Sequence, residues 1–180
     1  MDNTQVLTNW AIDTAHSEIH FKVKHMMVST VTGAFKTFEG SLSSENDDFS
    51  GADIQFNADI ASLDTNSAQR DTHLKSDDFF NAERFPKLTF KSTSFSKNGN
   101  GDYELTGGLT IRDKTHSIKL DVEYFGTAVD PYGQTKAGFE LKGKLSRKDY
   151  DLKWNAVTEA GSIVVSDEVR LVMSVQLTKQ

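Results

Sequence analysis

Alternation between apolar and polar residues is the feature that most constrains how this chain can fold. In residues 52–60 every second side chain is apolar, from Ala52 through Phe56 to Ile60, and the side chains between them are polar. Successive side chains of a β-strand point to opposite faces, so a period of two is typical of a strand with one buried face. The same pattern returns in residues 19–24, 105–111, 116–124, 137–145 and 169–177.

Turn-forming residues separate these strands. The sequence NGNG at residues 98–101 predicts a hairpin turn, because its central positions adopt positive φ at little cost. A second turn is predicted for DPYG at residues 130–133, and the acidic residues 45–49 are predicted to form a loop. About eight antiparallel strands with one apolar face each close most economically into a barrel, because closure removes exposed edges. Without a linker or repeat, we expect an all-β fold with residues 1–180 in one antiparallel β-barrel domain.

One segment breaks the alternation and predicts a helix. Residues 66–77 are mostly polar, and Asn66 followed by Gln69 resembles a capping box. The segment is too polar for a core helix, so we expect a short surface helix that covers an opening of the barrel. Phe79 and Phe80 follow it directly, and we expect their rings to fold inward behind the helix.

Glycines inside the predicted strands allow two interpretations. A barrel of about eight strands is just wide enough for packed side chains or for one small ligand. Glycine in a strand commonly marks a bulge or a tight corner, but a missing side chain could also leave room for a ligand inside. The two explanations can hold at different positions among Gly33, Gly40, Gly107, Gly108, Gly138 and Gly143.

Charge and cysteine content exclude several classes of protein. The chain has 20 basic and 26 acidic residues and a net charge of −6 at pH 7, so a nucleic-acid partner, which needs a basic surface, is not expected. Cysteine is absent, which excludes disulfides and thiolate sites. Residues 1–13 lack the basic and apolar regions of a secretion signal, and no stretch has membrane-spanning length. We expect no membrane span and a cytoplasmic protein as written, or a periplasmic one if a leader was removed.

The spacing of the histidines and other polar residues predicts no metal or nucleophilic site. His16 and His20 would lie roughly 13 Å apart on a strand, too far to bind one ion. Asp13, His16 and Ser17 lie side by side at a turn, where they cannot reach the geometry of a catalytic triad. We expect Asp13 and Ser17 to satisfy backbone groups at that turn, and we predict no catalytic residue, no metal and no cofactor.

Short motifs along the chain occur in an order that resembles one protein family. They are SLDT at residues 62–65, RDTHL at 70–74, DDFF at 77–80, RFPKLTFKS at 84–92 and LTGGLTI at 105–111. Further matches between Trp10 and about Leu177 are Trp10-Ala11-Ile12-Asp13, His16-Ser17, Gly33, Phe35, Phe38, Gly40, and Arg147 with Asp149. Together these motifs resemble the YceI family of lipid-binding proteins.

The resemblance implies a lipocalin-like fold, an extended antiparallel β-barrel with an amphiphilic ligand threaded through it. Members of the family bind polyisoprenoids or other long-chain lipids, with proposed roles in isoprenoid-quinone metabolism, transport or storage. Many carry a secretion signal and work in the periplasm. The chain departs from the family at Asp149-Tyr150-Asp151, where the usual residues are aspartate, phenylalanine and glycine, and the loss of this glycine puts the local turn in doubt.

We therefore predict a non-enzymatic protein that binds an amphiphilic long-chain lipid inside the barrel, polyisoprenoid or isoprenoid-quinone-like, for transport or storage. His25, Arg70 and His73, expected near a mouth of the barrel, are candidates for contact with the polar head. The residues predicted to contact the hydrocarbon are Phe21, Phe35, Phe38, Phe56, Phe79, Phe80, Phe90, Leu109, Phe139 and Trp154.

The sequence leaves two other functions open. In one, the protein is a lipid-modifying enzyme with His73 as acid or base and Arg70 bound to an anionic head group. In the other, the barrel is packed without a cavity and its outer surface binds a protein through an exposed apolar patch. A homodimer is also left open.

Overall fold

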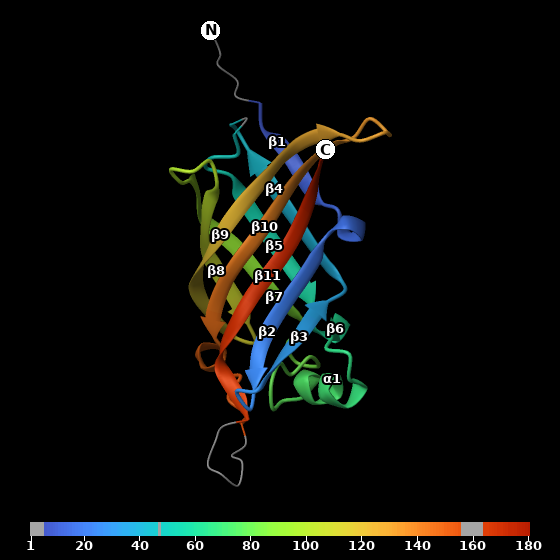
Figure 1. The fold of residues 1–180 in the computed structure, drawn as a ribbon, viewed down its shortest axis with the longest axis vertical. Helices are drawn as coiled ribbons and strands as arrows, with labels where there is room; N and C mark the ends of the chain where they lie inside the picture. Colours follow the sequence, from blue (N-terminus) through green and yellow to red (C-terminus); the bar gives the residue numbers. More distant parts are fainter. Residues whose placement is uncertain (1–5, 47, 156–163) are drawn as a thin grey trace.

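The computed structural model describes residues 6–46, 48–155 and 164–180, which form one antiparallel sheet curved into a long barrel (Figure 1). The helical segments are η1 (Thr14–His16), η2 (Ile60–Ser62), α1 (Ala68–Lys75) and η3 (Arg147–Tyr150). The strands are β1 (Thr8–Ile12), β2 (Glu18–His25), β3 (Ser29–Phe35), β4 (Phe38–Ser44), β5 (Asp53–Asp59), β6 (Leu63–Asp64), β7 (Lys87–Lys97), β8 (Tyr103–Ile111), β9 (Lys114–Val129), β10 (Thr135–Ser146) and β11 (Val165–Lys179).

Three breaks divide long strands of the barrel into shorter segments. β1 and β2 both pair with β11, while β3 pairs with β2 and its continuation β4 pairs with β1. β5 pairs with β4 and continues through η2 into β6, which pairs with β3. The barrel therefore has eight antiparallel strands, and it closes where Trp10 of β1 pairs with Lys179 of β11. The expected all-β barrel of about eight strands is confirmed.

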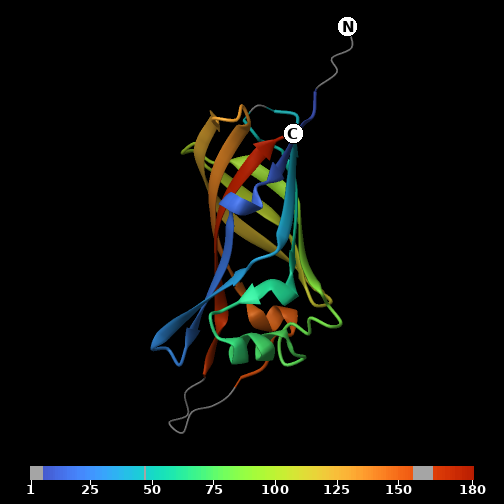
Figure 2. The same ribbon diagram turned by 90° about the vertical axis from the view of Figure 1, so that its right-hand side faces the viewer.

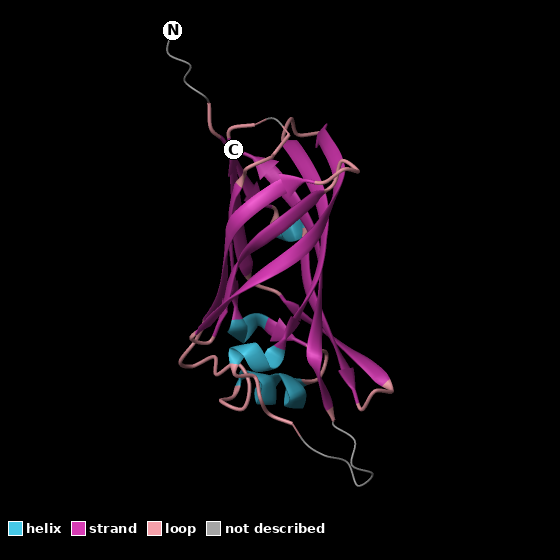
Figure 3. Ribbon diagram, turned by 90° about the vertical axis from the view of Figure 1, so that its left-hand side faces the viewer, coloured by secondary structure: helices cyan, strands magenta, loops and turns pink. Residues whose placement is uncertain are grey.

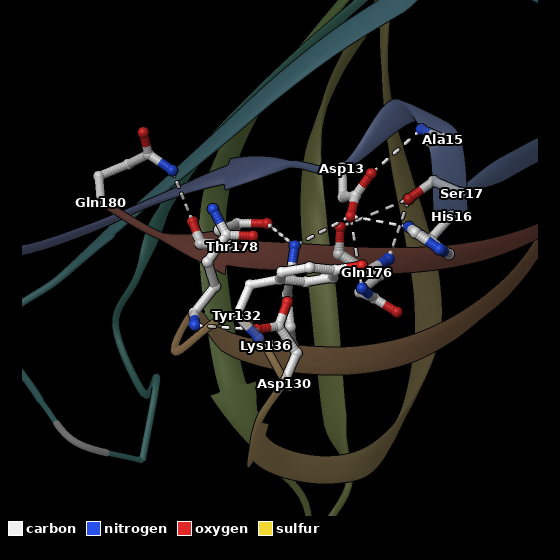
Figure 4. A network of polar contacts seen from close by, with 11 residues as sticks. Asp13, Ala15, His16, Ser17, Asp130, Tyr132, Lys136, Gln176, Thr178 and Gln180 are labelled. Atoms are coloured by element: carbon white, nitrogen blue, oxygen red, sulfur yellow. Dashed lines mark hydrogen bonds and ion pairs between the residues drawn. The ribbon is translucent and has the colours of Figure 1, made fainter.

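Both predicted turns join neighbouring strands. Between β7 and β8, the Asn98 N–H donates to the Asp102 carbonyl at 2.7 Å, and Gly101 has a φ of 83°. Between β9 and β10, the Asp130 carboxylate accepts a hydrogen bond from the Tyr132 amide at 2.8 Å (Figure 4). Both turns form where the sequence predicts them. The positive φ falls on Gly101 and not on the central Gly99 and Asn100, and the second turn gains a side-chain acceptor in Asp130.

A partly buried polar network holds the break between β1 and β2 against the barrel (Figure 4). The Asp13 carboxylate accepts hydrogen bonds from the Ala15 N–H at 3.1 Å and from Lys136 Nζ at 3.0 Å. The Ser17 hydroxyl accepts from the Gln176 N–H at 2.9 Å and donates to its carbonyl at 3.4 Å. Asp13 and Ser17 satisfy backbone groups at this turn, as the sequence predicts.

The charge of Asp13 is stabilised in this network. Desolvation alone would raise the pKa of the carboxyl group, but the hydrogen bonds from Lys136 and His16 outweigh it and hold the pKa of Asp13 below its ordinary value. Asp13 therefore stays ionised at neutral pH, and its ion pair with Lys136 links the break to β10.

Four aromatic side chains pack together at the upper end of the barrel (Figure 1), and we call Trp10, Phe49, Tyr124 and Phe139 the Phe49 cluster. Phe49 follows the acidic loop, is only 4% exposed and adopts a φ of 64°. Its ring packs against Trp10 at 5.3 Å, Phe139 at 5.6 Å and Tyr124 at 5.7 Å between ring centroids. The description of residues 45–49 as a polar loop is incomplete, because an isolated phenylalanine in a polar segment has no periodicity that reveals burial.

The lower end of the barrel is covered by helical segments and by the chain that follows α1 (Figure 3). α1 buries none of its residues, so it is a surface helix as expected. Its N-cap is Ser67, whose hydroxyl accepts from the Arg70 N–H at 3.3 Å, and not Asn66, which has a φ of 64°. Asn66 tolerates this left-handed conformation and forms the turn before the cap.

The departure at residues 149–151 leaves the turn intact. Asp151 ends η3 with a φ of 60° and donates its N–H to the Arg147 carbonyl. Aspartate visits the left-handed region more readily than most residues, so it replaces the glycine of the family pattern at a modest cost. Tyr150 is buried, with its ring 5.2 Å from His116 between centroids.

The Tyr150 hydroxyl has no hydrogen-bond partner among the described residues. Burial raises the pKa of Tyr150 to about 12, and the nearby charge of Asp149 adds to the shift.

Replacing Tyr150 by phenylalanine should stabilise the protein. An unpaired buried hydroxyl costs about 1–3 kcal/mol, so Tyr150→Phe should raise the free energy of unfolding by about 1 kcal/mol in urea titrations at neutral pH. In the wild type the pKa of Tyr150 is higher in the folded state than the unfolded value of 10. The stability that comes from keeping this phenol neutral is therefore complete below pH 10 and is lost between pH 10 and about 12. Tyr150→Phe should lack this part of the alkaline decline, and an identical pH profile would contradict the burial of the hydroxyl.

Candidate functional site

The barrel contains a cavity of about 610 Å³ lined mainly by the apolar faces of its strands. Pockets that hold small organic ligands have volumes of roughly 300–1,000 Å³. The cavity ends below the Phe49 cluster and reaches Phe79 and Phe80 at the other end. The alternative of a barrel packed without a cavity is therefore wrong.

Strand glycines keep this interior open, because aromatic rings lie flat over them. A Cβ atom on Gly33 would lie 2.2 Å from the Phe21 ring, and one on Gly107 would lie 2.4 Å from the Phe90 ring. The rings thus occupy space at the wall that ordinary side chains would fill, instead of crossing the centre of the barrel. Gly138, by contrast, lies at a bulge between β9 and β10. The bulge interpretation is confirmed at Gly138, and room for a ligand near Gly33 and Gly107 stays a prediction.

All but one of the residues predicted to contact a ligand line the cavity. Phe38 is the exception: it is buried and packs against Phe56 with 6.1 Å between ring centroids, but it does not line the cavity. Contact of any of these residues with a ligand stays a prediction. The predicted residues that line the cavity are Phe21, His25, Phe35, Phe56, Arg70, His73, Phe79, Phe80, Phe90, Leu109, Phe139 and Trp154.

Sequence reasoning missed the contribution of β11 to the cavity. Leu171, Met173 and Val175 line it, and each is only partly buried although it faces the interior. The period-two pattern of residues 169–177 identifies this face. A search directed at phenylalanines overlooks it because the strand has none.

Polar residues mark a mouth between the end of β2 and α1. His25 and Lys24 line the cavity from β2, and Gln69, Arg70 and His73 line it from α1. Lys24, Gln69 and Arg70 are also exposed, so the cavity reaches solvent between these elements. The mouth can therefore hold a polar group while apolar atoms occupy the interior.

The segment after α1 is attached to the barrel by Arg112 in the turn between β8 and β9. The guanidinium donates to the Phe79 carbonyl at 2.7 Å, to the Asp77 carbonyl at 2.9 Å and to the Asp77 carboxylate at 3.0 Å. On its inner side, Phe80 packs against Phe35 with 6.1 Å between ring centroids. These contacts hold the segment as a lid, defined as residues 65–86, over the lower end.

The start of the lid is held by a chain of hydrogen bonds. Arg70 donates from Nε to the Thr65 hydroxyl at 2.7 Å and from Nη2 to the Thr65 carbonyl at 2.5 Å. The Thr65 hydroxyl donates in turn to the Asp71 carboxylate at 2.5 Å. The side-chain hydrogen bonds that the structure shows for Arg70 thus go to Thr65, which is part of the lid.

His73 lies at the boundary between the mouth and the aromatic residues behind it. Its Nε2 atom is 2.8 Å from the Asp78 carboxylate. Its ring packs edge-on against Trp154 at 4.7 Å and Phe79 at 5.1 Å between centroids. His73 therefore couples α1 to two of the predicted ligand contacts.

A buried arginine supports the cavity wall near Trp154. Arg147 donates from Nη1 to the carbonyls of Leu152 at 2.5 Å and Trp154 at 2.7 Å, and from Nε to the Ser166 carbonyl at 2.9 Å. Burial lowers the pKa of Arg147, and the charge of Asp167 partly offsets this shift. The guanidinium satisfies backbone carbonyls where the chain between η3 and β11 would otherwise leave them unpaired.

Within residues 6–46, 48–155 and 164–180, no three acidic or histidine side chains are placed to hold a metal ion together. No helix in these ranges has the length and apolarity needed to cross a membrane.

Solved structures share this architecture. BcnA of Burkholderia cenocepacia superimposes with a TM-score of 0.79 at 22% identity, over 92% of this chain and 98% of that chain. The YceI protein of Campylobacter jejuni superimposes with a TM-score of 0.72 at 32% identity, over 93% and 96%. A polyisoprenoid-binding domain from Saccharophagus degradans gives a TM-score of 0.67 at 16% identity, over 95% and 98%.

Sequence comparison agrees with the fold. The protein YceI of Escherichia coli O17:K52:H18 is 36% identical over 165 residues, which cover 92% of this chain and 83% of that protein. The family described as YceI-like domain matches residues 10–177. The chain therefore belongs to the YceI family.

Proposed function

We propose that this protein holds one amphiphilic long-chain lipid, with its hydrocarbon in the barrel and its polar head at the mouth between β2 and α1, and that it carries or stores this lipid. The observation that carries the proposal is the distribution of polarity in the cavity. Apolar strand faces line its interior, whereas Lys24, His25, Gln69 and Arg70 lie where it reaches solvent.

The physical chemistry of the cavity favours a hydrocarbon chain. Burial of one methylene group is worth about 0.8 kcal/mol and needs no directional contact, so affinity grows with chain length. Aromatic rings laid along the wall provide such contacts. Polyisoprenoids are the class that the related domain from Saccharophagus degradans is described as binding, which supports a ligand of this kind here.

Binding without chemistry accounts for the residues at the mouth better than catalysis does. Arg70 holds Thr65, and His73 is packed between Phe79 and Trp154 while it contacts Asp78. These contacts stabilise the lid and need no substrate to explain them. Family membership supports the same conclusion, a lipid-binding barrel.

Native mass spectrometry tests the proposal directly, together with identification of organic-extractable material released on unfolding. The purified protein should carry a long-chain species in a one-to-one ratio, or should bind cis-parinaric acid saturably with an increase in its fluorescence. Leu171→Trp places a large ring in the cavity from β11, and it should abolish both signals with little loss of stability because it fills existing space.

Phe125→Trp is the matched control, because Phe125 is exposed on the outside of the barrel. It adds a similar ring without touching the cavity and should bind like the wild type. A wild-type protein that neither retains a lipid nor binds the probe would show that the cavity has another role.

Enlarging Gly33 should narrow the cavity near its mouth. In Gly33→Ala the new methyl group would displace the Phe21 ring, whose atoms are its three nearest neighbours at 2.2–2.7 Å. We expect about tenfold weaker binding of cis-parinaric acid and a loss of about 1–2 kcal/mol in stability. Gly40→Ala is the control, since its Cβ would have no neighbour closer than 3.4 Å; equal effects of the two changes would mean that ring displacement is not the cause.

Loosening the lid should accelerate ligand release. Arg112→Ala removes the hydrogen bonds to Asp77 and Phe79, so we expect the release rate of cis-parinaric acid to rise about tenfold in stopped-flow experiments. The loss of stability should be only about 1–2 kcal/mol. Arg84→Ala is the control, because Arg84 is exposed, its guanidinium carbon lies 5.2 Å from the Phe85 ring centroid, and its side chain forms no hydrogen bond or ion pair with a described residue. An unchanged release rate in Arg112→Ala would rule out the lid as the exit route.

A further inference from the structure

The hairpin formed by β2 and β3 ends in three adjacent exposed apolar residues. Met26 is 42% exposed, Met27 is 61% exposed and Val28 is 80% exposed. Exposed single apolar residues are common on soluble proteins, but three in sequence at the tip of a projecting hairpin form a compact apolar surface. We call Met26, Met27 and Val28 the hairpin tip.

The backbone of the hairpin tip gives no local reason for methionine. Met26 and Met27 have φ values of 51° and 58°, and the Val28 N–H donates to the His25 carbonyl at 3.1 Å, as in a type I′ turn. Asparagine and glycine adopt this conformation at much lower cost than methionine. The side chains at these two positions are therefore unfavourable for the turn, and they are exposed to water as well.

The hairpin differs in charge from the rest of the chain. Residues 19–38 contain no aspartate or glutamate, although the protein carries a net charge of −6. Lys22 and Lys24 in β2 form no ion pair with any described residue. An apolar tip with cations behind it, and no acidic residue near it in sequence, complements an anionic lipid surface.

The hairpin tip lies beside the mouth of the cavity. β3 pairs with β6 only through Ala34 and Phe35, so residues 29–33 pair with no strand on that edge within the described part of the chain. The hairpin accordingly stands away from the barrel wall (Figure 2). Its residues Val23 and Val31 line the cavity, so one hairpin supplies both the apolar tip and part of the cavity wall.

We propose that the hairpin tip inserts into the interface of an anionic bilayer and brings the mouth of the cavity against the membrane. This inference rests on the proposed function, because a long-chain lipid is nearly absent from water and must pass between a bilayer and the cavity. A few apolar side chains with two lysines give weak, reversible attachment. Such attachment suits a protein that must leave the membrane after it has taken up or delivered a lipid.

The test replaces the hairpin tip with a better turn. Met26→Asn with Met27→Gly removes both apolar side chains and supplies the residues that a type I′ turn favours, so the thermal midpoint should stay the same or rise. Co-sedimentation with vesicles of phosphatidylcholine and phosphatidylglycerol should show at least about tenfold weaker partitioning than the wild type. The single change Met27→Ser, which keeps the loop otherwise unchanged, should have a smaller effect in the same direction.

Two further variants identify the forces involved. Lys22→Gln with Lys24→Gln should weaken binding to vesicles that contain phosphatidylglycerol, and high salt should reproduce this loss in the wild type. Tyr132→Ser is the control for exposure alone, since Tyr132 is 89% exposed in the β9–β10 turn and follows the acidic Asp130. It should bind vesicles like the wild type.

The outcomes separate this inference from the proposed function. The variant Met26→Asn/Met27→Gly should still bind cis-parinaric acid from solution, whereas Leu171→Trp should lose the probe and keep vesicle binding. A wild-type protein that binds vesicles but neither retains a lipid nor binds the probe would overturn the proposed function and leave membrane attachment in place. Absence of vesicle binding by the wild type, or equal binding by the hairpin-tip variant, would overturn membrane attachment.

Discussion

The whole barrel depends on the way one edge of β11 is shared between two strands. β1 pairs with the last residues of β11 and closes the barrel, while β2 pairs with the rest of the same edge. Both strands run antiparallel to β11, and η1 separates them. The network of Asp13, Ser17, Lys136 and Gln176 makes this break stable by giving its backbone groups partners.

This break has consequences at both ends of the molecule. Above it, β1 and β4 complete the wall around the Phe49 cluster. Below it, the β2–β3 hairpin keeps its pairing with β11 but has only a short contact with β6 on the other side. The wall is therefore incomplete where β3 faces α1, and the mouth of the cavity results from strand pairing as much as from side chains.

Strand content and topology could be predicted because they depend on local signals that extend over many residues. Period-two alternation extends along each strand and identifies it several times over. The NGNG and DPYG turns and the polar segment around α1 then show where the strands end. Prediction missed the positions where the structure depends on the three-dimensional contacts of a single residue. Phe49 closes the upper end from a polar loop, Ser67 replaces Asn66 as N-cap, and Phe38 packs behind Phe56.

The candidate site could be predicted in part for a related reason. Alternation identifies which residues share a face, and a closed barrel turns that face into the lining of a cavity. Alternation does not tell whether the interior is filled. That depends on pairs such as Phe21 with Gly33, where the ring rests against the wall because the partner has no side chain. Such pairs are distant in sequence, and only the strand register brings them together.

The two ends of the cavity differ in how they are closed, and this difference favours one end as the route for a ligand. At the upper end, Trp10, Tyr124 and Phe139 are anchored in strands and surround Phe49, so opening would disrupt the ladder of the barrel. At the lower end, the lid is attached by the hydrogen bonds of Arg112 and by the buried rings of Phe79 and Phe80, whereas α1 itself buries no residue. Elements with few buried contacts open at lower free energy than core strands. A ligand that enters or leaves the intact barrel should therefore pass the lower end, where the polar residues of the mouth already lie.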